Sequence, residues 1–325
     1  MASAASRLAR ARPGEDPGFR RVRAGSGFRY VDADGTPVPD DDRERIRDLV
    51  IPPAWEDVWI ATDPLAHIQA VGTDDAGRRQ YLYHELWRAR RDRGKFARAL
   101  ALAEALPRAR ARVTATLRSG EADRALVLAV SFRLLDATSP RIGSARYLER
   151  HGSRGLTTLQ RRNAEVAASV IRLSFPAKSG RRAFLEINDA DLAPIVEELR
   201  KGRGRSPLLW YLRRRRQVGL TPTEVNRHVR ELTGGGFTAK DFRTLRGTIT
   251  AAEVLARIGT VDTARDRKRA EALAVRATAE ALGNTVSVAR ASYIDPRVFR
   301  HYDRGRLLDL AISPESAIRR LLSGR

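Results

Sequence analysis

Short β-prone pieces fill the chain from about residue 19 to residue 87, where Pro, Gly and Asp interrupt them repeatedly. Residues 28–38, FRYVDADGTPV, have the pattern of a strand, an Asp-Gly turn and a second strand. Residues 56–62, EDVWIAT, and residues 66–74, AHIQAVGTD, continue in the same manner. We therefore expect a small antiparallel β-sheet domain over residues 1–90.

The pattern changes at residues 88–96, RARRDRGKF, a charged stretch almost without apolar residues that we interpret as a bridge between two parts of the chain. Beyond it the apolar positions follow a helical period, and residues 122–136 carry them on a broad stripe. Two further helices are expected, each opened by a capping box of a threonine and an acidic residue three positions later: residues 221–232, with Thr221 and Glu224, and residues 238–258, with Thr238 and Asp241.

A β-prone interruption separates these helices. Residues 155–160, 169–175 and 182–188 have the composition of strands, and the turn at residues 176–180, PAKSG, separates the last two. The turn carries Lys178. We expect a small three-stranded sheet inside a mainly helical domain over residues 91–325, so the predicted fold class is α+β.

The composition removes several kinds of site. The chain has 325 residues and no cysteine, which excludes disulfides, thiolate nucleophiles and cysteine-ligated metals. Its five histidines show no ligand spacing, and we expect neither a metal site nor a cofactor. No apolar run approaches the roughly 18 residues of a membrane span, and the N-terminal stretch lacks the apolar region of a secretory signal. These features predict a cytoplasmic protein without a membrane partner.

Charge is the strongest signal in the composition. The chain carries 61 Lys and Arg residues against 39 Asp and Glu residues, a formal net charge of +22. A surface with this charge is expected to bind a polyanion. Arginine, the commoner cation here, can bind a phosphate group through two hydrogen bonds. A genomic bias toward Arg and Ala would also raise the arginine content. The charge favours nucleic acid as the partner. A membrane surface fits less well, because the sequence has no long basic amphipathic helix separate from the globular pattern.

Several residues have the side chains that metal-free phosphoryl transfer requires, namely a nucleophile, cations for the non-bridging oxygens and an acid for the leaving oxygen. Arg141 lies between a predicted helix and a glycine, and Lys178 lies on its hairpin turn. Lys240 and Arg243, three positions apart, share one face of a predicted first helical turn. Near the end of the chain follow Asn284 and Tyr293.

The order of these motifs carries more information than any one of them. R-I-G at 141–143, K-S-G at 178–180, K-D-x-R-T at 240–244 and a polar residue nine positions before Tyr293 together resemble the type IB DNA topoisomerases, in particular their compact poxvirus and bacterial branch. Residues 51–60 and 77–84 resemble the N-terminal domain of this family, and residues 151–163 and 286–298 resemble its catalytic domain.

The resemblance implies a role for each matching residue. Tyr293 would attack a backbone phosphodiester and form a 3′-phosphotyrosyl enzyme, while Arg141 and Arg243 hold the non-bridging oxygens and Lys178 protonates the departing 5′-oxygen. It also implies relaxation of supercoiled double-stranded DNA without ATP or metal, by a nucleoid-associated monomer that clamps the duplex between two domains. Asn284 departs from the family pattern, which usually has histidine there; an amide still donates a hydrogen bond but does not titrate near pH 7.

Tyr81 and Tyr83 alternate in a β-prone piece and therefore share one face of a strand. With Arg78 and Arg79 beside them they are candidate DNA contacts, as the matching tyrosines are in the family. The alternative is a pair of aromatic core residues. Lys240 is a further candidate DNA contact.

Two other functions remain open at this stage. Tyrosine recombinases share the same Arg, Lys, Arg and Tyr set, but they usually carry H-x-x-R where this chain has KDFR at 240–243, and a helical N-terminal domain. The other hypothesis is a non-enzymatic basic DNA-binding protein of the chromatin type, in which the order of the motifs would be a coincidence.

Overall fold

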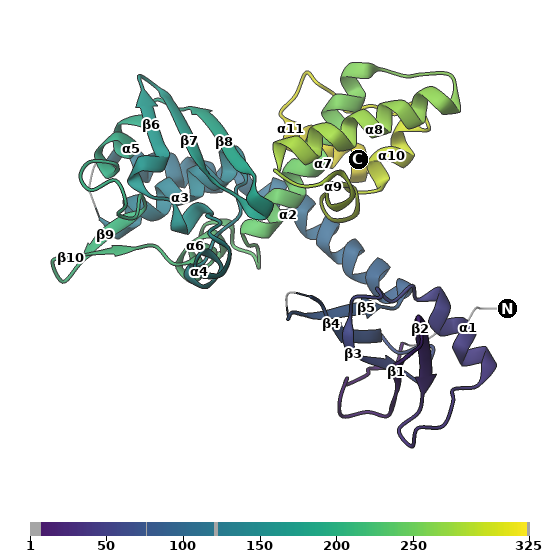
Figure 1. The fold of residues 1–325 in the computed structure, drawn as a ribbon. Coiled ribbons are helices and arrows are strands. Elements are labelled where there is room, and N and C mark those ends of the chain that lie inside the picture. The colour runs from purple at the N-terminus through teal and green to yellow at the C-terminus, as the bar shows by residue number, and fades with distance from the viewer. Residues whose placement is uncertain (1–7, 76, 120–122, 324–325) are drawn as a thin grey trace. The chain divides into compact units, whose positions relative to one another are not determined.

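The computed structural model describes residues 8–75, 77–119 and 123–323, apart from the side chain of Ser179. The chain divides into two compact units, Met1–Gly94 and Lys95–Arg325, and each is considered by itself (Figure 1). Among the described residues, none of the helices has the length and apolar character needed to cross a membrane.

The first unit is built on a five-stranded antiparallel sheet of order β2-β1-β3-β4-β5. Its elements are β1 (Gly18–Ala24), β2 (Gly27–Val31), α1 (Asp40–Asp48), β3 (Glu56–Ala61), β4 (Ile68–Thr73) and β5 (Arg79–Tyr83). Its core holds the following buried side chains: Phe19, Val38, Ile46, Ile51, Val58, Ile60 and Ala70. The expected N-terminal sheet is confirmed, and the strands predicted at 56–62 and 66–74 correspond to β3 and β4.

The hairpin predicted over residues 28–38 is wrong in its second arm. β2 is followed by a turn in which Asp32 Oδ1 accepts hydrogen bonds from the Thr36 and Asp34 amides at 2.9 and 3.0 Å. Beyond the turn only an isolated bridge joins Val31 to Pro37, because proline has no amide hydrogen to continue a ladder. The strand that pairs with β2 is β1, which precedes it.

The charged stretch at 88–96, which we interpreted as a bridge, is helical. It lies inside α2 (Glu85–Ser119), and the boundary between the two units falls within the same helix. Arginine, alanine and lysine are good helix formers, so the lack of apolar residues does not prevent a helix here. The later turns of α2 bury Leu102, Leu106 and Val113 in the core of the second unit.

The helix starts predicted at Thr221 and Thr238 are confirmed, and the helix predicted over residues 122–136 is present, although residue 122 lies outside the described residues. Asp123 caps α3 (Arg124–Thr138), where its side chain accepts a hydrogen bond from the Leu126 amide. Capping boxes open α6 (Pro222–Thr233) and α7 (Ala239–Ile258), with Glu224 Oε2 and Asp241 Oδ2 accepting from the threonine amides at 3.0 and 2.9 Å. The remaining helices are α4 (Ala145–His151), α5 (Ala193–Leu199), α8 (Ala264–Ala281), α9 (Val286–Tyr293), α10 (Arg297–Tyr302) and α11 (Pro314–Ser323).

The small three-stranded sheet is confirmed, but its first strand was misplaced. Its order is β6 (Ala164–Ala167), β7 (Val170–Pro176) and β8 (Arg182–Asn188). Residues 155–160, expected as a strand, contain a short 3-10 turn at Leu156–Thr158, in which Thr158 Oγ1 accepts a hydrogen bond from the Gly155 amide at 2.9 Å. This bond between a side chain and the nearby backbone competes with strand pairing. A second hairpin, β9 (Trp210–Arg213) and β10 (Arg216–Gly219), was not anticipated.

Candidate active site

Arg141 lies on the segment that leaves α3. Ser139 ends that helix in the left-handed conformation, with φ 48°, and turns the chain toward Arg141. The Arg141 carbonyl accepts a hydrogen bond from the Leu156 amide at 2.8 Å, and a Cβ atom on Gly155 would lie only 2.3 Å from that carbonyl oxygen. Glycine at 155 therefore allows the close backbone packing that fixes this segment.

Arg243 lies in the second turn of α7 and is only 5% exposed. Its guanidinium donates hydrogen bonds to the carbonyl oxygens of Ser139 at 2.8 Å and Leu282 at 2.7 Å, so it joins the ends of α3 and α8. Within the described part of the chain, its partners are backbone carbonyls and an amide, and no carboxylate pairs with it. Its positive charge is therefore not neutralised. Lys240, one turn earlier, is exposed.

Asn284 is 6% exposed, and two guanidinium groups fix the orientation of its side-chain amide. Its Oδ1 accepts hydrogen bonds from Arg141 Nη2 and, at 3.4 Å, from Arg243 Nη2. Because an arginine can only donate, the oxygen must face the arginines and the amide nitrogen must point away from them. In the described structure this Nδ2 group is buried and has no hydrogen-bond acceptor. The site thus contains an oriented donor that lacks a partner.

Tyr293 ends α9, and its aromatic ring lies against the Arg243 guanidinium, with 5.1 Å between the guanidinium carbon and the ring centre. A Cβ atom on Gly247 would come within 2.7 Å of the Tyr293 carbonyl oxygen, so glycine permits the close contact between α7 and α9. Burial alone would raise the pKa of Tyr293. The charge and the hydrogen bond of Arg243, together with the charges of Arg141 and Lys240, outweigh that effect and leave the pKa below its ordinary value.

Residues 84–304 match the family model described as "Eukaryotic DNA topoisomerase I, catalytic core", and residues 27–74 match "Bacterial DNA topoisomerase IB, N-terminal domain". The chain belongs to the type IB DNA topoisomerases. It is also 29% identical over 286 residues to the "DNA topoisomerase 1B" of Acanthamoeba polyphaga mimivirus, an alignment that covers 85% of each protein. The family resemblance is confirmed, and it decides against the recombinase and chromatin-protein readings.

Lys178 of this topoisomerase lies at the tip of the β7–β8 hairpin, in the short turn Lys178–Gly180. Its side chain is exposed, and among the described residues no hydrogen bond or ion pair joins it to the other four site residues. The turn end of the hairpin is anchored beside them, because Arg181, the last residue before β8, donates a hydrogen bond from Nη1 to the Asn284 carbonyl oxygen at 3.3 Å. Lys178 therefore extends from a hairpin that is tied to the site.

Three arginines that sequence reasoning missed complete the surroundings of Arg141 and Arg243. They are Arg154, Arg181 and Arg182, and all five line one cavity of about 490 Å³. Among the described residues that line it, the one carboxylate is that of Glu280. Such a cavity favours an anion. In a chain with 61 cations, no spacing rule distinguishes these three from surface arginines.

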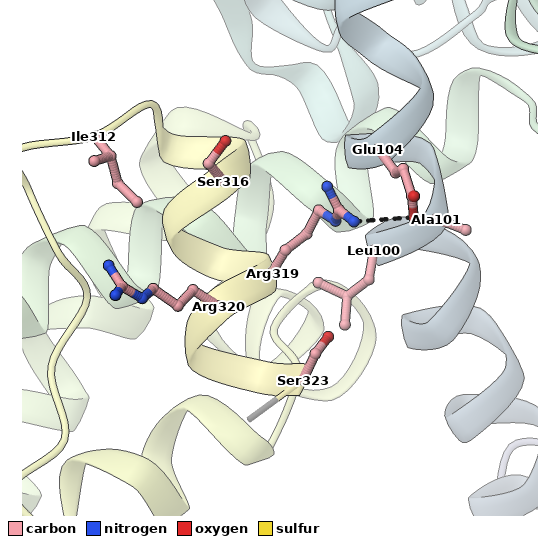
Figure 2. Close-up of a pocket in the computed structure, with 8 residues that line it drawn as sticks. All are labelled: Leu100, Ala101, Glu104, Ile312, Ser316, Arg319, Arg320 and Ser323. Atoms are coloured by element: carbon pink, nitrogen blue, oxygen red, sulfur yellow. Dashed lines mark ion pairs between the residues drawn. The ribbon is translucent and has the colours of Figure 1, made fainter. Parts of the chain in front are cut away.

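A larger cavity of about 720 Å³ between α2 and α11 has no such character. Figure 2 shows Arg319 reaching across it toward Glu104, with which it forms an ion pair at 3.1 Å. Arg320 on its other side lies 3.6 Å from Asp309. Both of its arginines are paired with carboxylates, and none of the five site residues lines it. We therefore do not assign the active site to this cavity.

In the first unit, Tyr81 and Tyr83 lie on one face of β5, with their rings stacked at 6.0 Å between centres. Leu82 between them packs against the hydrophobic core, so the tyrosines are on the opposite face. Tyr81 is 39% exposed, and its ring lies 5.9 Å from the Arg79 guanidinium. Arg78 is exposed and pairs with Asp74 at 2.7 Å. This face is therefore open, aromatic and basic.

Proposed function

We propose that this topoisomerase relaxes supercoiled DNA by cutting one strand transiently through a 3′-phosphotyrosyl intermediate, letting the strand rotate and then rejoining it. The observation that carries the proposal is the convergence of Tyr293, Arg243, Arg141 and Asn284 in one cluster of contacts. These contacts support a site in which one phosphodiester would meet the Tyr293 phenol together with the cations of Arg141 and Arg243.

In the proposed cleavage step, the Tyr293 oxygen bonds to phosphorus while the bond from phosphorus to the 5′-oxygen breaks. The phenolic proton passes to solvent, and Lys178 gives a proton to the departing 5′-oxygen. The lowered pKa of Tyr293 makes its phenolate more accessible than that of an ordinary tyrosine. Religation reverses both bond changes, so the phosphotyrosyl bond conserves the energy of the phosphodiester and the cycle needs neither ATP nor a metal.

Negative charge that builds on the non-bridging oxygens would be met by three donors. Arg141 and Arg243 supply charge-assisted hydrogen bonds, and Asn284 supplies its unpartnered Nδ2 group. These donors are already oriented before DNA arrives, which is the condition under which such stabilisation is most effective.

We further propose that the protein acts as a monomer that clamps a duplex between a domain at residues 1–90 and a domain at residues 91–325. Tyr81, Tyr83, Arg78 and Arg79 contact DNA from the first domain, and Lys240 contacts it from the second. A DNA-relaxing enzyme of this kind would work in the cytoplasm, associated with the nucleoid.

The function is tested with a supercoiled plasmid in EDTA without ATP. We expect relaxation of both positive and negative supercoils, and SDS added during the reaction should trap a covalent protein–DNA adduct. Tyr293→Phe, which removes only the hydroxyl, should bind DNA but give neither product. A strict requirement for Mg²⁺ would contradict the proposal, and products joined from two duplexes would indicate a recombinase instead.

The acid role of Lys178 is tested by changing the leaving group. Lys178→Ala should slow cleavage of ordinary DNA by about 10²–10⁴-fold, the usual contribution of a general acid. With sulfur in place of the bridging 5′-oxygen, the thiolate leaves unprotonated, so the variant should recover most of the wild-type single-turnover rate. If sulfur gives no recovery, Lys178 does not act as the acid.

Asn284→Ala removes the oriented amide donor and should slow cleavage by about 10²–10³-fold, with little change in DNA affinity. Asn284→His restores a donor and should keep substantial activity, with a new inflection near pH 6.5 in its rate profile. Single-turnover cleavage across a pH series measures both effects. Wild-type cleavage by Asn284→Ala, or an inactive but folded and DNA-bound Asn284→His, would show that the amide has a different part in the site.

A further inference from the structure

The turn that carries Lys178 is closed by a backbone hydrogen bond. The Ala177 amide donates to the Arg181 carbonyl oxygen at 2.7 Å, and the ladder between β7 and β8 runs up to this turn. Gly180 has φ 70°, in the left-handed region that glycine enters without strain. The position of the Lys178 backbone therefore follows the two arms that enter and leave the turn.

The arm that enters the turn is held by the segment after α4. The Arg154 amide donates a hydrogen bond to the Pro176 carbonyl oxygen at 2.7 Å, and Ser153 Oγ donates one to the Ala177 carbonyl oxygen at 3.0 Å. Ser153 is buried, and backbone groups take part in both bonds. This arm is therefore fixed without the help of a charged side chain.

The arm that leaves the turn is held by a side chain. Arg181 Nη1 donates a hydrogen bond to the Asn284 carbonyl oxygen at 3.3 Å, which joins the hairpin to the segment between α8 and α9. Arg182, the next residue, is also an exposed arginine, but its Nε donates to Ser174 Oγ at 2.8 Å, within the hairpin itself. The tie between this arm and the site therefore passes through Arg181.

The segment that receives Arg181 is itself held at several points. The Asn284 amide donates to the Ala279 carbonyl oxygen at 2.8 Å, and the Gly283 carbonyl oxygen accepts from Arg141 at 3.2 and 3.3 Å. The Asn284 side chain accepts from Arg141 and Arg243. One short segment thus orients the amide donor of the site and also receives the hairpin that carries the acid.

We propose that Arg181 is a positioning residue, which places Lys178 at the 5′-oxygen of the cleaved phosphodiester. The inference rests on the proposed function, in which the Lys178 ammonium gives its proton to that oxygen. No bond is made or broken at Arg181, which keeps its protons throughout. Loss of its bond to Asn284 would free the arm that leads into β8, and Lys178 would then occupy its reacting position for less of the time.

The test compares ordinary DNA with DNA that carries sulfur at the bridging 5′-position of the cleavage site. Arg181→Ala should slow single-turnover cleavage of ordinary DNA by about 10–100-fold, because a misplaced acid loses part of its contribution. Cleavage of the sulfur substrate, whose thiolate leaves without a proton, should stay close to the wild-type rate. Arg181→Lys keeps a long cationic donor and should recover part of the loss on ordinary DNA.

Arg182→Ala is the matched control. It removes an equal charge from the same cavity and leaves the bond between Arg181 and Asn284 in place. Any loss in this variant should be equal on the two substrates. If Arg181→Ala melts at the wild-type temperature and is also equally slow on both, Arg181 binds a non-bridging phosphate oxygen directly and the proposal is overturned. Wild-type cleavage of ordinary DNA by Arg181→Ala would overturn it as well.

A double variant shows whether Arg181 acts through Lys178. In Lys178→Ala/Arg181→Ala the acid is already absent, so cleavage of ordinary DNA should be no slower than in Lys178→Ala alone. Losses that multiply would contradict the inference. Lys178→Ala on the sulfur substrate separates the two proposals. Without recovery there, the acid assignment fails and the role of Arg181 fails with it, whereas recovery in Lys178→Ala but not in Arg181→Ala overturns the role of Arg181 alone.

Discussion

The buried guanidinium of Arg243 is the interaction on which the rest of the candidate site depends. It is held by the carbonyl oxygens that end α3 and α8, it contacts the Asn284 amide, and its guanidinium carbon lies 5.1 Å from the centre of the Tyr293 ring. Burying a charge is costly unless hydrogen bonds satisfy it, and here the bonds come from neutral groups. Arg243 is thereby fixed in position while its charge stays available to a phosphate.

Neighbouring contacts keep the first turns of α7 in place around Arg243. Asp241 accepts hydrogen bonds from the Thr238 amide and hydroxyl, both at 2.9 Å, and from Arg98 at 3.0 Å. Thr248, one turn beyond Arg243, donates to the Tyr293 carbonyl oxygen at 3.2 Å. The same helix therefore orients both the cation and the backbone of the tyrosine. A shift of α7 would displace them together.

Local signals in the sequence were enough to predict the helix starts and the turn that carries Lys178. A capping box such as Thr221 with Glu224 is complete within four residues, so no tertiary information is needed. The pairing of β2 with β1 and the turn at residues 155–160 depended on proline chemistry and on a side-chain hydrogen bond that β-propensity does not describe. Arg181 could not be found at all, because its partner Asn284 is 103 positions away along the chain.

The central claim is that Arg243 sets the ionisation of Tyr293, and the pKa of that phenol tests it most directly. Tyrosine labelled with ¹³C at Cζ can be titrated by NMR, and the Tyr293 signal is assigned by its absence from Tyr293→Phe. We expect a wild-type pKa below the ordinary value of about 10. Arg243→Gln removes the charge that opposes burial and should raise the pKa, while Arg243→Lys should keep it low. A wild-type pKa at or above 10, or no rise in Arg243→Gln, would contradict the account.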